Sequence, residues 1–128
     1  MYRVLRPGGV LVASVPNLAS LHNRVLLALG RQPTSIRTRG PHVRGYTLRE
    51  FRGLLALDGA LEVCGVHGVG FHPLPPRLGA PVARLWAGAS HTPVYVARKR
   101  DERRPDPWTA YRAAEDAAGV QTTYTARG

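Results

Sequence analysis

The stretch Met1-Tyr-Arg-Val-Leu-Arg-Pro-Gly-Gly-Val-Leu-Val-Ala-Ser-Val-Pro-Asn17 decides how this chain folds. Pro7 lacks a backbone donor and disfavours helix in the residue before it, so a preceding helix must end there. Gly8 and Gly9 allow a tight turn, and an apolar run follows from Val10 to Val15. A strand that is apolar on both faces is typical of a strand covered on both sides, so the stretch predicts the interior of an α/β sheet.

The composition restricts the class of protein. A chain of 128 residues is long enough for one domain with a core of its own. It has no apolar run of about 18 residues, and its opening lacks the pattern of a secretory signal, so we expect neither a membrane span nor export. The single cysteine, Cys64, cannot form an internal disulfide and fits a cytoplasmic protein. On a strand it reads as a small buried hydrophobe rather than a nucleophile.

The charge is strongly positive. Eighteen Lys and Arg against eight Asp and Glu give a net charge of +10. Such a field attracts polyanions, so a non-catalytic basic adaptor that binds polyanions or an anionic membrane surface is one alternative function. No nucleic-acid recognition motif accompanies the charge, so we do not expect a nucleic-acid partner.

Two helices are expected after the opening strand. Helical spacing of apolar residues predicts the first over Leu18–Leu29, with Asn17 as its N-cap. A basic loop follows over residues 31–45. The second helix, over Leu48–Leu57, has a complete start signal. This signal combines a capping box with a hydrophobic staple, in the residues Tyr46, Thr47, Glu50 and Phe51.

The rest of the chain reads as two strands and a tail. Alternation and β-branched residues predict strands over Leu61–Val69 and Thr92–Ala97, and Pro93 suits a strand start or an edge. A short amphipathic helix over Leu78–Trp86 lies between them, either packed on the core or covering a lipid acceptor at a membrane surface. The polar residues 100–128 predict a disordered tail, with a transient helix around residues 110–118.

Two of these motifs together resemble class I S-adenosylmethionine-dependent methyltransferases, in the half of the domain that binds the methyl acceptor. In that family an LxPGG turn and strand are followed by an insertion and a capped helix of the form Tyr-Thr-x-x-Glu-Phe-x-x-Leu-Leu. A glycine and an antiparallel strand pair then close the sheet. Here the motifs are Leu5–Gly9, Tyr46–Leu55 and Gly59, and the resemblance covers residues 1–99. It implies an α/β fold with a partial Rossmann-like sheet, over the C-terminal part of a methyltransferase domain.

The resemblance also implies which part of the enzyme is missing. The family binds its cofactor with a glycine-rich loop after the first strand and with acidic residues at the ribose and the adenine, and the chain has none of these. Gly65-Val-His-Gly-Val-Gly70 precedes Phe71 rather than a helix start, so it fails as a nucleotide loop. We expect S-adenosylmethionine in the complete enzyme, no cofactor bound by this truncated chain alone, and a separate N-terminal half or a homo-oligomer as partner.

Four residues are candidates for the acceptor site. His42 is the first choice as general base, because imidazole titrates near neutral pH and the residue lies in the loop before the capped helix. Asn17 follows the strand and could contact the acceptor, the alternative being a helix cap. Arg44 and Tyr46 could orient an anionic or aromatic acceptor, with a solvated charge and the staple as alternatives. The acceptor would be a small molecule, lipid or glycan, and no metal site is expected.

Overall fold

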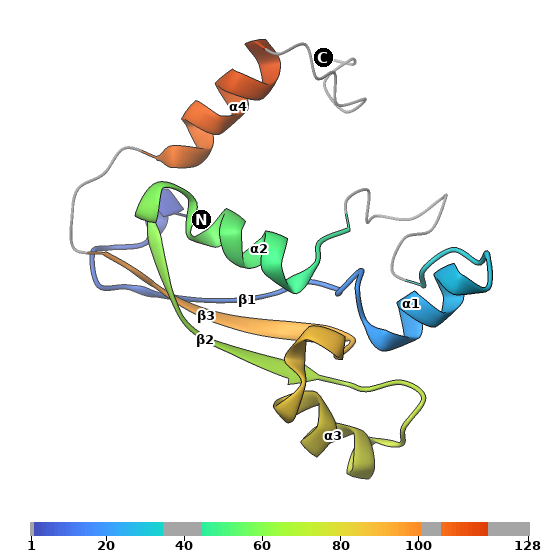
Figure 1. Cartoon of the computed structure of the whole chain (residues 1–128). Helices are drawn as coiled ribbons and strands as arrows, with labels where there is room; N and C mark the ends of the chain where they lie inside the picture. The colour runs from blue at the N-terminus through green and yellow to red at the C-terminus, as the bar shows by residue number, and fades with distance from the viewer. Residues whose placement is uncertain (1, 35–44, 101–105, 118–128) are drawn as a thin grey trace.

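The computed structural model describes residues 2–34, 45–100 and 106–117 (Figure 1). These residues form an α/β fold around an open, three-stranded antiparallel sheet with the order β1-β3-β2. The strands are β1 (Val10–Ser14), β2 (Leu61–Val69) and β3 (Thr92–Lys99). Because β3 is antiparallel to both neighbours, β1 and β2 run in the same direction. The predicted strands are thus confirmed, including the antiparallel pair, and Pro93 lies near the start of the central strand.

The Pro-Gly-Gly turn connects a short 3-10 helix, η1 (Tyr2–Val4), to β1. Gly8 has a φ of 73°, and a Cβ on Gly9 would lie 2.8 Å from the carbonyl oxygen of Arg6. The turn is also fastened to the end of β3. The Gly8 N–H donates to the Lys99 carbonyl at 3.0 Å, and the Lys99 N–H donates to the Gly9 carbonyl at 2.9 Å. Glycine is required at both positions, at one for its positive φ and at the other for close backbone contact.

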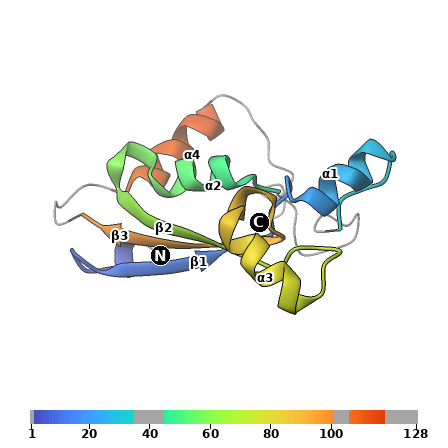
Figure 2. The ribbon, with the colours of Figure 1, turned by 60° about the horizontal axis from the view of Figure 1, so that its bottom comes forward.

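β1 is covered on one face only. In the described part of the chain it pairs with β3 alone, and Val10 and Val12 are 52% and 64% exposed. Val12 lies opposite the half-buried Val96, so this uncovered face continues onto β3. The prediction of a strand covered on both faces is therefore wrong for these residues, because the helices that pack on the sheet over Leu61 and Tyr95 leave this face bare (Figure 2).

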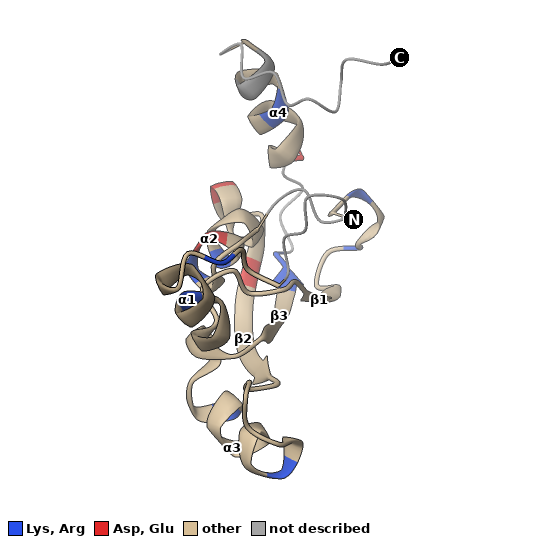
Figure 3. Ribbon diagram, turned by 90° about the vertical axis from the view of Figure 1, so that its right-hand side faces the viewer, with Lys and Arg blue, Asp and Glu red and all other residues tan. Residues whose placement is uncertain are grey.

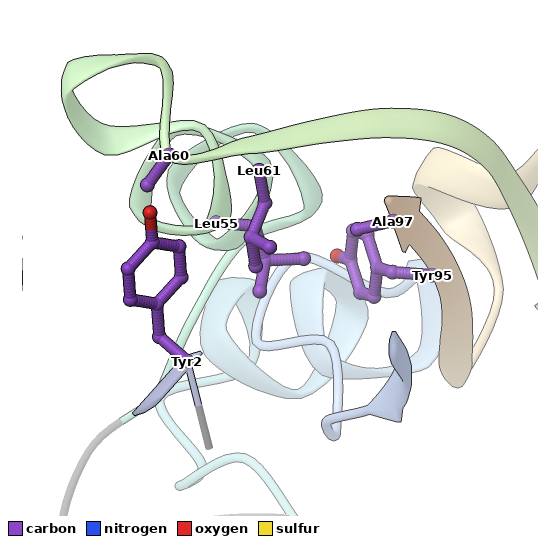
Figure 4. Close-up of a cluster of buried hydrophobic side chains, with 6 residues drawn as sticks. All are labelled: Tyr2, Leu55, Ala60, Leu61, Tyr95 and Ala97. Atoms are coloured by element: carbon purple, nitrogen blue, oxygen red, sulfur yellow. The ribbon is translucent and has the colours of Figure 1, made fainter. Parts of the chain in front are cut away.

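The opposite face of the sheet carries the main core. Its centre is Tyr95 of β3, whose ring centroid lies 4.9 Å from that of Phe51. Burial raises the pKa of Tyr95 to about 12, and its hydroxyl donates to the Leu48 carbonyl at 3.4 Å. Figure 4 shows the buried cluster, which consists of Tyr2, Leu55, Ala60, Leu61, Tyr95 and Ala97.

The helix over this core is α2 (Leu48–Leu55). The Thr47 hydroxyl accepts from the Glu50 N–H at 3.3 Å, and the Glu50 carboxylate accepts from the Thr47 N–H at 2.9 Å. The rings of Tyr46 and Phe51 lie 5.4 Å apart. The capping box and the staple are both confirmed. The helix ends slightly earlier than predicted, and a 3-10 turn, η2, occupies residues 57–59.

Two other helices sit at the right-hand end of the sheet in Figure 1. Helix α1 (Leu21–Ala28) begins later than predicted, because Ser20 rather than Asn17 is its N-cap and accepts from the Asn23 N–H at 3.4 Å. Helix α3 (Pro76–Leu85), followed by the 3-10 turn η3 (87–89), confirms the predicted amphipathic helix.

Helix α3 packs against the end of β2 at Gly68. A Cβ there would overlap the Ala83 carbonyl and lie 2.8 Å from the Ser90 hydroxyl oxygen. Gly68 therefore serves close packing between β2 and α3. Cys64, on the same strand, is exposed, so the prediction that it is buried is wrong. It occupies a position next to a β-bulge between Val63 and Gly65.

Part of the segment expected to be a disordered tail is a helix, α4 (Pro107–Ala117). Trp108 anchors it, with a ring centroid 5.4 Å from that of Tyr2, and the Lys99 ammonium lies 4.1 Å from the centroid of the same Tyr2 ring. The average polarity of the segment hides the aromatic anchor Trp108. Among the described residues, no helix is long and apolar enough to cross a membrane.

Candidate functional site

The candidate site lies where β1 and β2 end and β3 begins. Since β1 and β2 run in the same direction, their carboxyl ends share one end of the sheet. Three connections meet there: residues 15–20 into α1, residues 70–75 into α3, and residues 86–91 into β3. Open α/β sheets bind ligands outside the carboxyl ends of their parallel strands, so this end is the first place to look for a site.

Asn17 fastens these connections together. It is 1% exposed, and its Nδ2 donates to the carbonyls of Gly88 and Ser90, both at 2.9 Å. Its Oδ1 accepts from the Ala19 N–H at 3.0 Å, and its backbone N–H donates to the His91 carbonyl at 2.9 Å. The side chain of Asn17 is therefore engaged by the protein itself, and it positions the residues that lead into β3.

A second buried amide extends this arrangement to α1. Asn23 is 1% exposed, and its Nδ2 donates to the backbone carbonyl of Asn17 at 2.9 Å. Its Oδ1 accepts from both the N–H and the hydroxyl of Thr34, each at 3.2 Å. Asn23 thus holds the start of α1, and the residues that follow this helix, against the end of β1.

We call the side-chain hydrogen bonds of Asn17 the latch. Three imidazoles lie near it, those of His22, His72 and His91, which we call the histidine trio. The ring centroids of His22 and His72 are 5.9 Å apart, and those of His72 and His91 are 5.3 Å apart in an edge-to-face arrangement. The three come from α1, from the connection after β2, and from the residue before β3. His22 and His91 are half-buried and His72 is exposed, so the trio borders solvent.

The electrostatics of the site favour the neutral form of His91. The pKa of His91 lies below its ordinary value of 6.5, first because burial penalises the charged ring and then because His72 and His22 repel a third positive charge. The His91 Nδ1 lies 3.0 Å from the Thr92 hydroxyl oxygen, which orients the ring. A neutral imidazole at neutral pH can accept a proton from a bound hydroxyl group.

The structure brings two of the predicted site residues together. Tyr46 forms an isolated parallel bridge with Asn17, and its carbonyl accepts from the Leu18 N–H at 2.9 Å. His42 and Arg44, the predicted base and anion contact, lie outside the described residues. Sequence reasoning missed the trio because its members are far apart in the chain. The signal that could have found it is the position of each histidine next to a predicted strand end.

The described residues form no nucleotide loop of the kind that would hold an adenosyl cofactor. The one glycine-rich stretch runs inside β2, and Gly68 faces Ala83 of α3, so it forms no loop at a helix start. In the described ranges, no group of three or more His, Cys, Asp or Glu side chains is placed to hold a metal ion. No protein-family model, no curated protein and no solved structure matches this chain.

Proposed function

We propose that this chain is the acceptor-binding part of a cytoplasmic class I S-adenosylmethionine-dependent methyltransferase. The observation that carries the proposal is the order and direction of the elements. A Pro-Gly-Gly turn leads into β1, an insertion and the capped helix α2 follow, and β2 pairs antiparallel with β3. This is the order that the two sequence motifs imply for the acceptor side of that family.

The free edge of β1 supports the incomplete character of this unit. Within the described residues β1 is paired on one side only, and Val10 and Val12 are exposed beside that edge. An unpaired apolar edge strand is a liability that native proteins cover. We propose that a cofactor-binding unit, made of residues outside these 128, covers this edge and supplies the glycine-rich loop.

The chain's own residues would bind and orient the acceptor. Positioning is the main contribution to a group-transfer reaction, and a base is needed only when the acceptor must lose a proton. The Asn17 latch keeps the strand ends rigid, and the histidine trio lies at the edge of that rigid region. A hydroxyl acceptor is the kind that such imidazoles can deprotonate.

Photolabelling tests the proposal. The affinity-tagged chain is purified from an extract of its source cells and irradiated with tritiated S-adenosylmethionine, which marks the protein that holds the cofactor. We expect the label on a copurifying polypeptide. Val12→Asp, at the exposed edge, should abolish this copurification. Leu85→Asp on α3, where the native leucine is 90% exposed, is the matched control and should leave it intact. Label on this chain itself, or no labelled polypeptide at all, would overturn the proposal.

The basic adaptor remains the second candidate because of the net charge of +10. Figure 3 shows the Lys and Arg positions of the described residues spread over several elements rather than collected on one face. A dispersed charge favours weak, non-specific attraction over a defined polyanion interface. Retention on heparin that falls steeply with salt, together with no photolabelled partner, would favour the adaptor over the methyltransferase.

A further inference from the structure

We infer that the histidine trio is a binding site for a phosphate-type oxyanion, and that this site fills as the imidazoles take up protons. The inference does not depend on methyl transfer. If the chain does bind a methyl acceptor, the oxyanion would be a phosphate group of that acceptor.

The spacing of the rings suits one shared anion. The centroid separations along the trio are 5.3 Å and 5.9 Å. Rings this close touch one another, so a shared anion would lie beside them at the solvent side, and each ring would donate one charge-assisted hydrogen bond of about 2.8 Å to it. Each protonated imidazole has two N–H donors. The His91 Nδ1 already faces the Thr92 hydroxyl oxygen, so His91 would donate through Nε2, and neighbouring rings can donate to different oxygens of the same ligand. The half-buried His22 and His91 would hold it from below, with the exposed His72 at the solvent side.

The segments that carry the three histidines bring no acidic side chain to the site. Residues 1–49 and 63–100, which supply all three histidines, contain no Asp or Glu. Arg24 lies on α1 two residues after His22, and its Nε donates to the Ala19 carbonyl at 2.7 Å. On α3, Arg77 is exposed in the first turn. Every charged group that these segments bring to this end of the sheet is therefore positive or can become so.

The first acidic residue of the sequence, Glu50, already accepts a hydrogen bond from the backbone. Glu50, at the start of α2, accepts from the Thr47 N–H at 2.9 Å, and this bond lowers the pKa of its carboxyl group. Protonating two or three neighbouring imidazoles without an anion costs free energy through mutual repulsion. A bound oxyanion removes that cost, so proton uptake and anion binding are coupled.

Nuclear magnetic resonance of the imidazole protons tests this inference on the intact chain. Inorganic phosphate is titrated at constant ionic strength, with chloride as the replacement anion, at about pH 5.5 and about pH 8. We expect the resonances of His22, His72 and His91 to shift together, with binding tighter by about tenfold or more at the lower pH, which corresponds to a coupling of about one pKa unit. His67, exposed on β2 and outside the trio, should not respond.

A variant pair and a second probe complete the test. His72→Gln removes the exposed donor and should weaken phosphate binding about tenfold, whereas His67→Gln should leave it unchanged. Flotation with phosphatidylcholine vesicles, with and without phosphatidic acid, distinguishes a lipid head group from free phosphate. Phosphate binding or vesicle flotation that depends on His72 supports the site. Equal binding at both pH values, or equal response of His67 and the trio, would overturn the inference.

Discussion

The two faces of the sheet differ in what covers them. Under α2, Leu61 and Tyr95 are almost fully buried, while on the other face Val10 and Val12 are exposed. All four side chains are large and apolar or aromatic, so hydrophobicity alone does not decide which face is covered. The difference lies in whether a helix of the same chain packs there. The covered face therefore stabilises this unit. We propose that another unit joins at the uncovered face and at the edge of β1 that the described residues leave unpaired.

The largest expected effect is on the covered face, at its central aromatic residue. Tyr95→Ala removes a fully buried ring that packs on Phe51 and leaves a cavity under α2. We expect a loss of about 3–5 kcal/mol in the free energy of unfolding. Urea titration followed by circular dichroism measures it. A loss below about 1 kcal/mol, typical of a surface site, would mean that this face is not the core.

The contact between β2 and α3 should be nearly as sensitive. Gly68→Ala places a methyl group against the Ser90 hydroxyl and against the Ala83 carbonyl, which cannot move without shifting the backbone. We expect a destabilisation of about 1–3 kcal/mol. Gly53→Ala on α2, where a Cβ would meet nothing within 4 Å, is the matched control and should be neutral or stabilising. Equal effects of the two variants in the same urea titration would contradict this packing.

The latch at the candidate site is the next most sensitive position. Asn17→Ala leaves the carbonyls of Gly88 and Ser90 without their amide donor in a buried place. The expected cost is about 1–3 kcal/mol. Since the latch also positions His91, the trio's imidazole resonances should broaden or move. If they stay unchanged while stability falls, the latch supports the fold but does not position the trio.

A smaller effect comes from pH. The folded-state pKa of His91 is lowered from 6.5, so the unfolded chain binds a proton more readily than the folded one. The contribution of this group to stability is therefore complete above about pH 6.5 and is lost as the pH falls through its lower folded value. His91→Gln should flatten this part of the stability profile, measured by thermal melts across the range. An unchanged profile in the variant would assign the pH dependence to other groups.

The smallest effect is expected on the uncovered face. Val12→Asp should change the free energy of unfolding by less than about 1 kcal/mol, because the side chain it replaces is mostly in water. The same urea titration measures it. A destabilisation as large as that of Tyr95→Ala would show that both faces are buried in solution. A small change makes this variant a sound probe of partner binding, since lost copurification cannot then be ascribed to unfolding.

The sequence predicted local features well and the coverage of the sheet poorly. The capping box at Thr47 and Glu50, the glycine turn and the bounds of β2 depend on residues close together in the chain. The exposed side of β1 could not be predicted, because an apolar strand looks the same whether or not a layer covers it. The sequence predicts Asn17 as the N-cap of α1, whereas Ser20 caps the helix. Only the tertiary hydrogen bonds of Asn17 show that its side chain is engaged elsewhere.

The histidine trio shows the same limit at the candidate site. His22 and His72 are far apart in the chain, on the segments that follow β1 and β2. Only the common direction of these two strands brings the segments to one end of the sheet. The sequence drew attention instead to His42, which lies outside the described residues.

Isothermal titration calorimetry of the purified 128-residue chain with S-adenosylhomocysteine tests the central claim most directly. We expect no binding heat, because in the described part of the chain the glycine-rich stretch lies along β2 and forms no loop at a helix start. Stoichiometric binding with micromolar affinity by this chain alone would contradict it.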